Sequence, residues 1–179
     1  MKDKLKIVKI ALIVLSIISV LNIFLPYAKA TGTYKEYLEN NKDSFYIEKI
    51  GMKNKDAVNM SLFEFSKIYR ETANIDLGDV KEESIIRLVL ISAIAISSLL
   101  VVLFAFKNKR ALIITFNVIA FISFLLLKYD MSSAKVLPSD SYAYGFAYYL
   151  YYVVFILIFA GTIYSIICNK KANKETKTA

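Results

Sequence analysis

Four long uncharged runs of apolar residues limit what this chain of 179 residues can fold into more than any other feature. The runs cover residues 10–28, 88–106, 111–127 and 147–168. A helix needs about 20 mostly apolar residues to cross the hydrocarbon core of a membrane. Lipid offers the backbone no hydrogen-bond partners, so each crossing segment has to be helical. The sequence therefore predicts an all-α membrane protein built as a four-transmembrane-helix bundle.

The net charge of +8 is concentrated between these runs. Residues 1–9, 107–110 and 170–179 each carry a net charge of +3, whereas residues 27–84 contain eleven acidic and nine basic side chains. Segments rich in Lys and Arg stay on the cytoplasmic side of a membrane. We therefore expect a multi-pass plasma-membrane protein with cytoplasmic N- and C-termini, in contact with the lipid bilayer and with no nucleic-acid partner. The excess of Lys over Arg is typical of a low-GC bacterium.

The runs and the charges together predict an order of segments along the chain. These are an N-terminal cytoplasmic end with the first span (1–28), an extracellular segment (29–84), the second span (85–106), a cytoplasmic turn (107–110), the third span (111–127), a second extracellular loop (128–142), the fourth span (143–168) and a cytoplasmic tail (169–179). The first 30 residues also fit a secretory signal peptide, because Ala28-Lys29-Ala30 forms an A-x-A cleavage pattern. Their apolar run is longer than the usual signal core of about 7–15 residues, which favours retention as a span.

The extracellular segment is too long for a simple connection, so we expect it to have structure of its own and to be partly helical. Residues 33–40 are predicted to form a short helix, and residues 45–51 a strand or an extended stretch. The sequence Ser61-Leu62-Phe63-Glu64 has the S-x-x-E form of a capping box, which predicts that a helix begins there.

Aromatic residues of this last helix are the first candidates for an interaction surface, namely Phe63, Phe65 and Tyr69. A segment of this size with no disulfide is marginal on its own. We therefore expect its aromatic faces to pack on the ends of the spans or on a partner. Three uses stay open: a lid on its own bundle, a docking surface for another protein and a small-ligand site.

A dense group of tyrosines begins the fourth span. Tyrosine is enriched at membrane interfaces because its ring prefers the boundary while its hydroxyl stays wet. The candidates Tyr144, Tyr148, Tyr151 and Tyr152 share one side of the predicted helix and form a denser stripe than anchoring requires. Stacked phenols can bind a cation, a sugar or an aromatic face of a partner. We hypothesise that this stripe meets the Phe and Tyr residues of the extracellular segment.

The spans contain only mildly polar residues in their interior, and Arg87 is placed where its side chain can reach the outer interface. Ser19, Asn22, Ser97 and Asn117 are candidates for hydrogen bonds that pack the helices together. A polar pocket between Asn22 and Asn117 is the alternative. Asp, Glu and His do not occur within the hydrocarbon runs, which argues against a proton-coupled transporter or an ion pump.

The residues needed for several kinds of chemistry do not occur in this sequence. It has no His, and Cys168 is its single cysteine, so a His-dependent catalytic group or a Cys/His metal cluster cannot form within the chain. We predict no enzyme activity, no cofactor and no metal site. The expected function is that of a non-catalytic membrane protein that acts through contacts with a protein partner or in a homo-oligomer, as an accessory, scaffold or immunity-type subunit. A small transporter or an oligomeric pore subunit is the alternative.

The layout resembles that of claudin-like four-span proteins. It shares a long first outer segment, a very short inner turn, a shorter second outer loop and two inner termini. The resemblance covers the whole chain but consists of spacing alone. The Trp and the paired Cys of the claudin first outer segment have no counterparts, because the chain has no Trp and Cys168 lies at the other side. The resemblance therefore implies an architecture and no specific activity.

Overall fold

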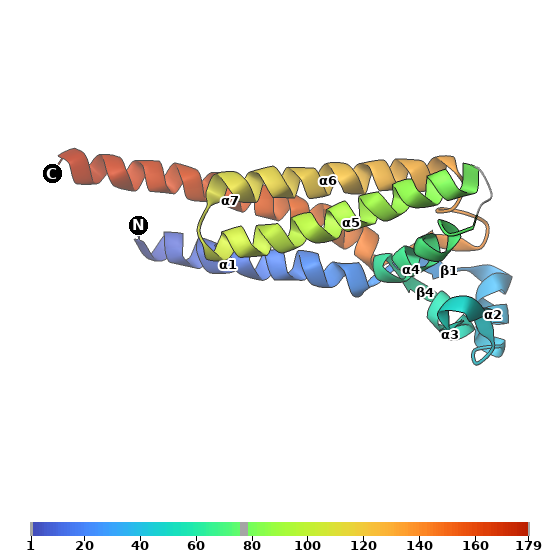
Figure 1. The fold of residues 1–179 in the computed structure, drawn as a ribbon. Helices are drawn as coiled ribbons and strands as arrows, with labels where there is room; N and C mark the ends of the chain where they lie inside the picture. Colours follow the sequence, from blue (N-terminus) through green and yellow to red (C-terminus); the bar gives the residue numbers. More distant parts are fainter. Residues whose placement is uncertain (1, 76–78, 179) are drawn as a thin grey trace.

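This computed structural model describes the backbone of residues 2–75 and 79–178, and the side chains of residues 5–75 and 80–171. Four long helices form an elongated bundle (Figure 1): α1 (Lys2–Leu21), α5 (Asp79–Phe106), α6 (Arg110–Ser133) and α7 (Phe146–Thr178). Each of the four contributes a stretch that is long and apolar enough to cross a membrane. By length and composition, the prediction of a mostly helical multi-pass membrane protein is therefore confirmed.

The observed helices differ from the predicted spans at the end of the bundle remote from the termini. Helix α6 continues to Ser133, beyond the predicted end of the third span at residue 127. Helix α7 begins only at Phe146, because residues Tyr142–Tyr144 form strand β5. The predicted second loop is therefore largely ordered, as a helix extension and a strand.

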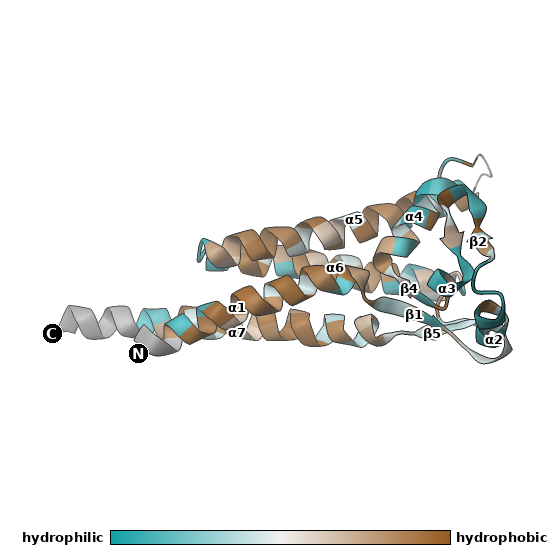
Figure 2. Cartoon of the chain, turned by 90° about the horizontal axis from the view of Figure 1, so that it is seen from below, coloured by the Kyte–Doolittle hydropathy of each residue, from teal (hydrophilic) through white to brown (hydrophobic). Residues whose placement is uncertain are grey.

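The bundle is apolar on its outside as well as in its core, as the hydropathy colouring in Figure 2 shows. On α1, Ile7, Ile10, Val14, Ile17 and Leu21 are spaced three or four residues apart and are 40–66% exposed. A surface helix of a soluble protein would carry polar residues at such positions. This exposed face of α1 therefore fits contact with lipid chains.

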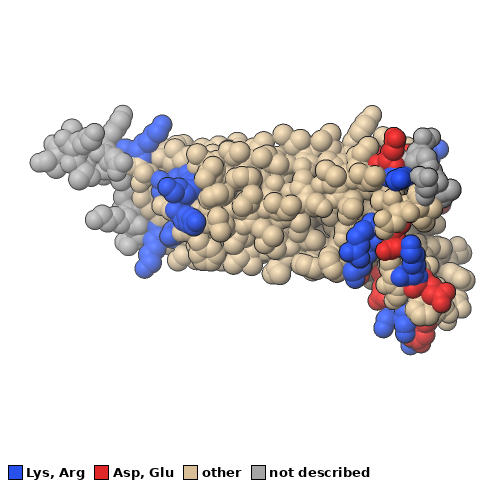
Figure 3. All heavy atoms as spheres, viewed as in Figure 1, with Lys and Arg blue, Asp and Glu red and all other residues tan. Residues whose placement is uncertain are grey.

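Among the side chains that the structure describes, charged residues lie at the two ends of the bundle. The face seen in Figure 3 has an uncharged belt along the middle, with Lys and Arg at the end that holds the termini and charges of both signs at the other end. A charged side chain in the hydrocarbon region is costly unless it is paired or reaches the interface. The belt therefore fits the part of the bundle that lies in hydrocarbon.

The end remote from the termini carries a small folded unit, which we call the lobe and define as residues 26–75 and 134–145. It is visible beside and beyond the helix ends in Figure 1. Its elements are β1 (Pro26–Ala30), α2 (Gly32–Asn40), β2 (Phe45–Ile47), β3 (Met52–Lys53), α3 (Asn54–Ala57), β4 (Asn59–Ser61), α4 (Leu62–Thr72) and β5 (Tyr142–Tyr144), with a short 3-10 helix at Glu48–Ile50. A second 3-10 helix at Asn22–Phe24 lies between α1 and the lobe.

A three-stranded antiparallel sheet with the order β4-β1-β5 is the centre of the lobe. Strand β1 pairs Ala28 with Met60 on one side and with Tyr144 on the other. The all-α description is therefore incomplete. Strands of three to five residues leave a weak sequence pattern, and these partners lie far apart in the sequence. The sheet also joins the two predicted outer segments into one unit.

The local predictions for the lobe are confirmed in part. Helix α2 lies at the expected position, whereas only Phe45–Ile47 of the predicted extended stretch form strand β2 and Glu48–Ile50 form a short 3-10 helix. At the start of α4, the Glu64 amide donates to Ser61 Oγ at 3.2 Å, and the Ser61 amide donates to a Glu64 carboxylate oxygen at 2.6 Å. This reciprocal pair is the predicted capping box. Part of the predicted break after α4, residues 76–78, lies outside the described residues.

Candidate functional site

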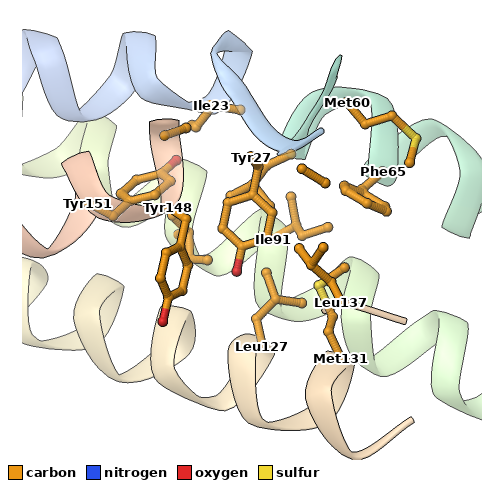
Figure 4. Packing of buried hydrophobic residues seen from close by; sticks show 14 of the residues in the cluster. Ile23, Tyr27, Met60, Phe65, Ile91, Leu127, Met131, Leu137, Tyr148 and Tyr151 are labelled. Atoms are coloured by element: carbon orange, nitrogen blue, oxygen red, sulfur yellow. The ribbon is translucent and has the colours of Figure 1, made fainter. Parts of the chain in front are cut away.

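Tyr27 is the point at which the lobe is attached to the bundle. Helix α1 ends at Leu21 and is followed by the 3-10 helix at Asn22–Phe24. Pro26 lacks an amide hydrogen and does not favour helix continuation, so the chain goes on in the extended conformation of β1. This arrangement places the fully buried Tyr27 ring between the lobe and the helices, as Figure 4 shows. Its sequence position after Pro26 gave no indication of this central role.

Four aromatic rings from four different elements surround Tyr27. The ring centroids of Phe65 in α4, Phe124 in α6, Tyr144 in β5 and Tyr148 in α7 lie 6.0–6.4 Å from that of Tyr27, all in edge-on geometry. We call these five residues the aromatic junction. Such pairs contribute about 0.5–1.5 kcal/mol each beyond the area they bury. Together they fix the orientation of the lobe on the bundle.

Gly145 allows the close backbone approach that the aromatic junction requires. Its amide donates to the Tyr27 carbonyl at 2.8 Å. A Cβ atom at this position would lie 2.4 Å from the Pro26 carbonyl oxygen, far inside normal contact. The residue between β5 and α7 therefore has to be glycine for the two segments to pack in this way.

The predicted tyrosine stripe of the fourth span is divided between two environments. Tyr144 belongs to β5 and not to the helix, although its ring still stacks on Tyr148 at 3.9 Å. The Tyr148 hydroxyl lies 3.3 Å from the Tyr152 hydroxyl, within hydrogen-bond distance. Tyr151 is fully buried in the bundle and stacks on Phe155 at 5.4 Å. Tyr144 and Tyr148 of the stripe contact Tyr27, which lies at the end of the predicted first span and in turn contacts Phe65 of the predicted outer segment.

The candidates in α4 are also divided. Phe65 and Tyr69 are buried and stack on each other at 5.9 Å, with Phe65 in the aromatic junction. Phe63 is 42% exposed and points away from this cluster, against Phe24. The structure therefore brings Phe65 to Tyr27 and Tyr69 to Arg87, and leaves Phe63 on a separate surface.

A partly buried ion pair beneath α4, formed by a buried arginine with two more exposed carboxylates, was missed by the sequence reasoning. The Arg87 guanidinium is nearly buried and donates to Asp130 at 2.5 Å and to Glu83 at 2.7 Å. It also lies 5.5 Å from the centre of the Tyr69 ring. A sequence signal was present, because Arg87 and Asp130 are almost equally far from the turn at residues 107–110 and so lie at the same height in a helical hairpin.

The polar residues predicted to pack the helices lie at helix contacts. The Ser19 and Ser98 hydroxyls are 3.1 Å apart, and Ser97 next to Ser98 is buried. The side-chain amides of Asn22 and Asn117 each donate at 3.0 Å to a backbone carbonyl of α7, at Ala147 and Phe155 respectively. These carbonyls are about 12 Å apart along the helix. The two amides therefore reach the same helix at separate levels.

The lobe contains a cleft of about 260 Å³ between α4 and the segment that leads to β5. Its lining is aromatic and aliphatic and consists of Tyr46, Ile47, Met60, Phe65, Ile68, Tyr69, Val136 and Tyr142. The Tyr142 hydroxyl donates to the Ala57 carbonyl at 2.8 Å.

Phenols are neutral at physiological pH, and burial raises the pKa of both Tyr69 and Tyr142 further above its ordinary value. Neutral rings and aliphatic side chains suit an apolar or aromatic group of a binding partner.

No protein-family model matches this chain, and no curated protein or solved structure is significantly similar to it.

Proposed function

We propose that this chain is a non-catalytic integral plasma-membrane protein that acts through protein contacts made by its lobe and helix bundle. The observation that carries the proposal is the structure of the lobe. Its orientation is fixed where it contacts the helix bundle, and its end remote from the bundle exposes aromatic residues. The aromatic junction provides the fixed attachment. At the exposed end, Tyr37 is 58% and Phe45 is 56% accessible.

Aromatic residues on a fixed support are well suited to binding another protein. Tyr and Phe are enriched in the centres of protein interfaces. A surface that is ordered before binding loses less conformational entropy when the partner arrives. Tyr37 is already restrained in this way, because its ring stacks on Tyr34 at 6.5 Å. The proposed role is accordingly that of an accessory, scaffold or immunity-type subunit.

We also propose on which side of the membrane the termini and the lobe lie. The three segments with a net charge of +3 favour the cytoplasmic side for both termini, which directs the lobe outward. The claudin-like layout is part of the same proposal, with the two outer segments combined in one lobe. Tyr27 and the central strand β1 both lie within the first 30 residues, so cleavage there would remove the attachment of the lobe. We therefore expect mature protein that retains these residues, which N-terminal sequencing can check.

The contacts of the polar residues in the bundle favour the proposed role in protein contacts over the transporter alternative. Asn22 and Asn117 use their amide groups to hold α7, and the Ser19 hydroxyl meets that of Ser98. Each of these residues thus serves helix packing. The transporter alternative instead needs Asn22 and Asn117 to face one water-filled path.

Isolation of the full chain from native membranes in mild detergent tests the proposal. We expect a stoichiometric protein partner or a second copy to be retained by the wild type and lost from the double variant Tyr37→Ser, Phe45→Ser. The matched control is Tyr129→Ser, which removes a 73% exposed ring outside the lobe and should leave the complex intact. A solitary wild-type monomer, or a double variant that binds as the wild type does, would contradict the proposal. Solute flux in liposomes by a solitary chain would favour the transporter.

A further inference from the structure

The lipid-facing surface of α1 continues without interruption onto the lobe. The exposed apolar positions of α1 are followed by Phe24, which is 57% exposed and ends the candidate span Leu5–Phe24. The Phe24 ring lies 5.2 Å from the Phe63 ring in the first turn of α4. Leu25, also exposed, lies next to Phe24. An apolar path therefore leads from the bundle to α4.

Helix α4 has a basic side next to this path. Its buried side is formed by Leu62, Phe65 and Tyr69, which face the lobe and the bundle. On a different side, Lys67 lies one turn after Phe63, and its ammonium nitrogen is 4.5 Å from the centre of the Phe63 ring. Arg70 is exposed one turn further on. Figure 3 shows Lys and Arg gathered where the lobe borders the uncharged belt.

We propose that this side of α4 rests on the headgroup layer of the leaflet on the lobe side of the membrane. Phe24 and Phe63 lie at the boundary between acyl chains and headgroups, and the cationic groups of Lys67 and Arg70 contact lipid phosphates. The apolar face of a helix that lies on a membrane carries residues such as Phe at this boundary, and a lysine can extend its charged end into the headgroup region. Basic residues close to a membrane are also attracted to anionic lipids.

The occupant is the bilayer of the protein itself because the surface is continuous with the lipid-facing side of α1. Phe63 touches the last residue of a span, so the ring lies within one side-chain contact of the hydrocarbon layer. A lobe that lies on the leaflet keeps its α2 and β2 elements, at the far end in Figure 2, directed away from the membrane. This inference goes beyond the proposed protein contacts and does not depend on them.

The absence of tryptophan from the sequence allows a direct depth measurement. Phe63→Trp introduces a single tryptophan, which can be excited separately from the tyrosines, and the full chain is then reconstituted in vesicles with lipids brominated near the headgroup end of the acyl chain. The control is Phe45→Trp, in which the replaced ring has a similar exposure but lies at the far end of the lobe. We expect bromolipid to quench F63W strongly and F45W weakly, and aqueous iodide to do the reverse.

Equal quenching of the two variants by bromolipid, or stronger iodide quenching of F63W, overturns the proposal. Phe24→Trp is a second reporter if F63W does not fold, and weak bromolipid quenching of F24W overturns it as well.

The role of Lys67 is tested in the F63W background by comparing vesicles of phosphatidylcholine alone with vesicles that also contain anionic phosphatidylglycerol. Anionic lipid should favour the docked lobe by about fivefold for each of the two basic residues, which corresponds to about 1 kcal/mol per residue near the surface. Lys67→Gln should therefore weaken this response by about fivefold and leave the contribution of Arg70. Lys35→Gln, at a 50% exposed lysine on α2, should keep the full response. An unchanged response in K67Q overturns the assigned phosphate contact, and an equal weakening in both variants overturns its specificity for α4.

Discussion

Substitution of Gly145 by alanine tests how the lobe is attached to the bundle. The added methyl group would lie 2.4 Å from the Pro26 carbonyl oxygen, 2.9 Å from the Pro26 carbonyl carbon and 3.1 Å from the Tyr27 carbonyl carbon. Ordinary contact begins at 3.4 Å, so the backbone segments have to separate by about 1 Å. The atoms in the way belong to the backbone of β1 and cannot rotate aside.

The expected cost follows from two changes at the same position. Overpacking in a rigid environment typically costs about 1–3 kcal/mol. The displacement also lengthens the hydrogen bond of 2.8 Å from the Gly145 amide to the Tyr27 carbonyl, with a loss of about 1 kcal/mol. We therefore expect Gly145→Ala to destabilise the attachment of the lobe by about 3 kcal/mol. This is about two orders of magnitude in the equilibrium between attached and detached forms.

Hydrogen exchange of the full chain in nanodiscs, read by mass spectrometry, measures this change. Amides of β1, β4 and β5 should exchange about 100-fold faster in the variant, because exchange follows the local opening equilibrium. The matched control is Gly161→Ala in α7, where the new methyl group meets a Leu12 side-chain carbon at 3.2 Å. That side chain can move, and alanine favours the helix by about 1 kcal/mol. We expect little change in G161A.

The reasoning is refuted if G145A exchanges in the three strands at the wild-type rate. It is also refuted if G145A and G161A have equal effects, because the difference between a backbone and a side-chain obstacle is the basis of the prediction.

Three further perturbations address other contacts. Tyr148→Ala combined with Tyr152→Ala should speed proteolysis of the lobe. An unchanged rate would show that the tyrosine stripe does not help to hold the lobe on the bundle. Asp130→Asn should lower the free energy of unfolding, measured by thermal denaturation in detergent, by about 1–3 kcal/mol. The buried Arg87 then loses one charged acceptor but keeps Glu83. An unchanged stability would contradict this prediction. Burial and a hydrogen bond to Tyr46 raise the pKa of Tyr34 to about 12, so its contribution to stability is complete below pH 10 and is lost between pH 10 and 12. Near-ultraviolet circular dichroism measured against pH should show this loss of stability in the wild type. The loss should be smaller in Tyr34→Phe. An equal loss in the wild type and the variant would contradict the prediction.

The parts of the fold that sequence reasoning predicted depend on contiguous residues. An uncharged run has to lie in lipid or in a core, and the spacing of Ser61 and Glu64 is sufficient to begin a helix. The candidate tyrosines Tyr148 and Tyr151 were found because one helical side repeats every three or four residues. Each of these signals is complete within a short window of the chain.

The parts that were missed depend on residues far apart in the sequence. Strand β1 has partners in β4 and β5, and the short length of these strands leaves no alternation long enough to detect. Tyr27 follows a span and Pro26, where a tyrosine at the membrane interface is the common case. The ion pair between Arg87 and Asp130 was predictable in principle from their equal distance to the turn.

The same long-range contacts decide which form of the protein can be used to look for a partner. A fragment covering residues 26–75 would contain Tyr27 and Phe65 but would lack strand β5 and the rings contributed by α6 and α7. One side of β1 would then be an unpaired sheet edge, and Tyr27 would lose three of the four rings around it. Such a fragment exposes apolar surface that the full chain buries, so it binds proteins through the wrong residues. The exposed end of the lobe is therefore presented in the orientation that the proposed protein contacts require only by the full chain in a membrane.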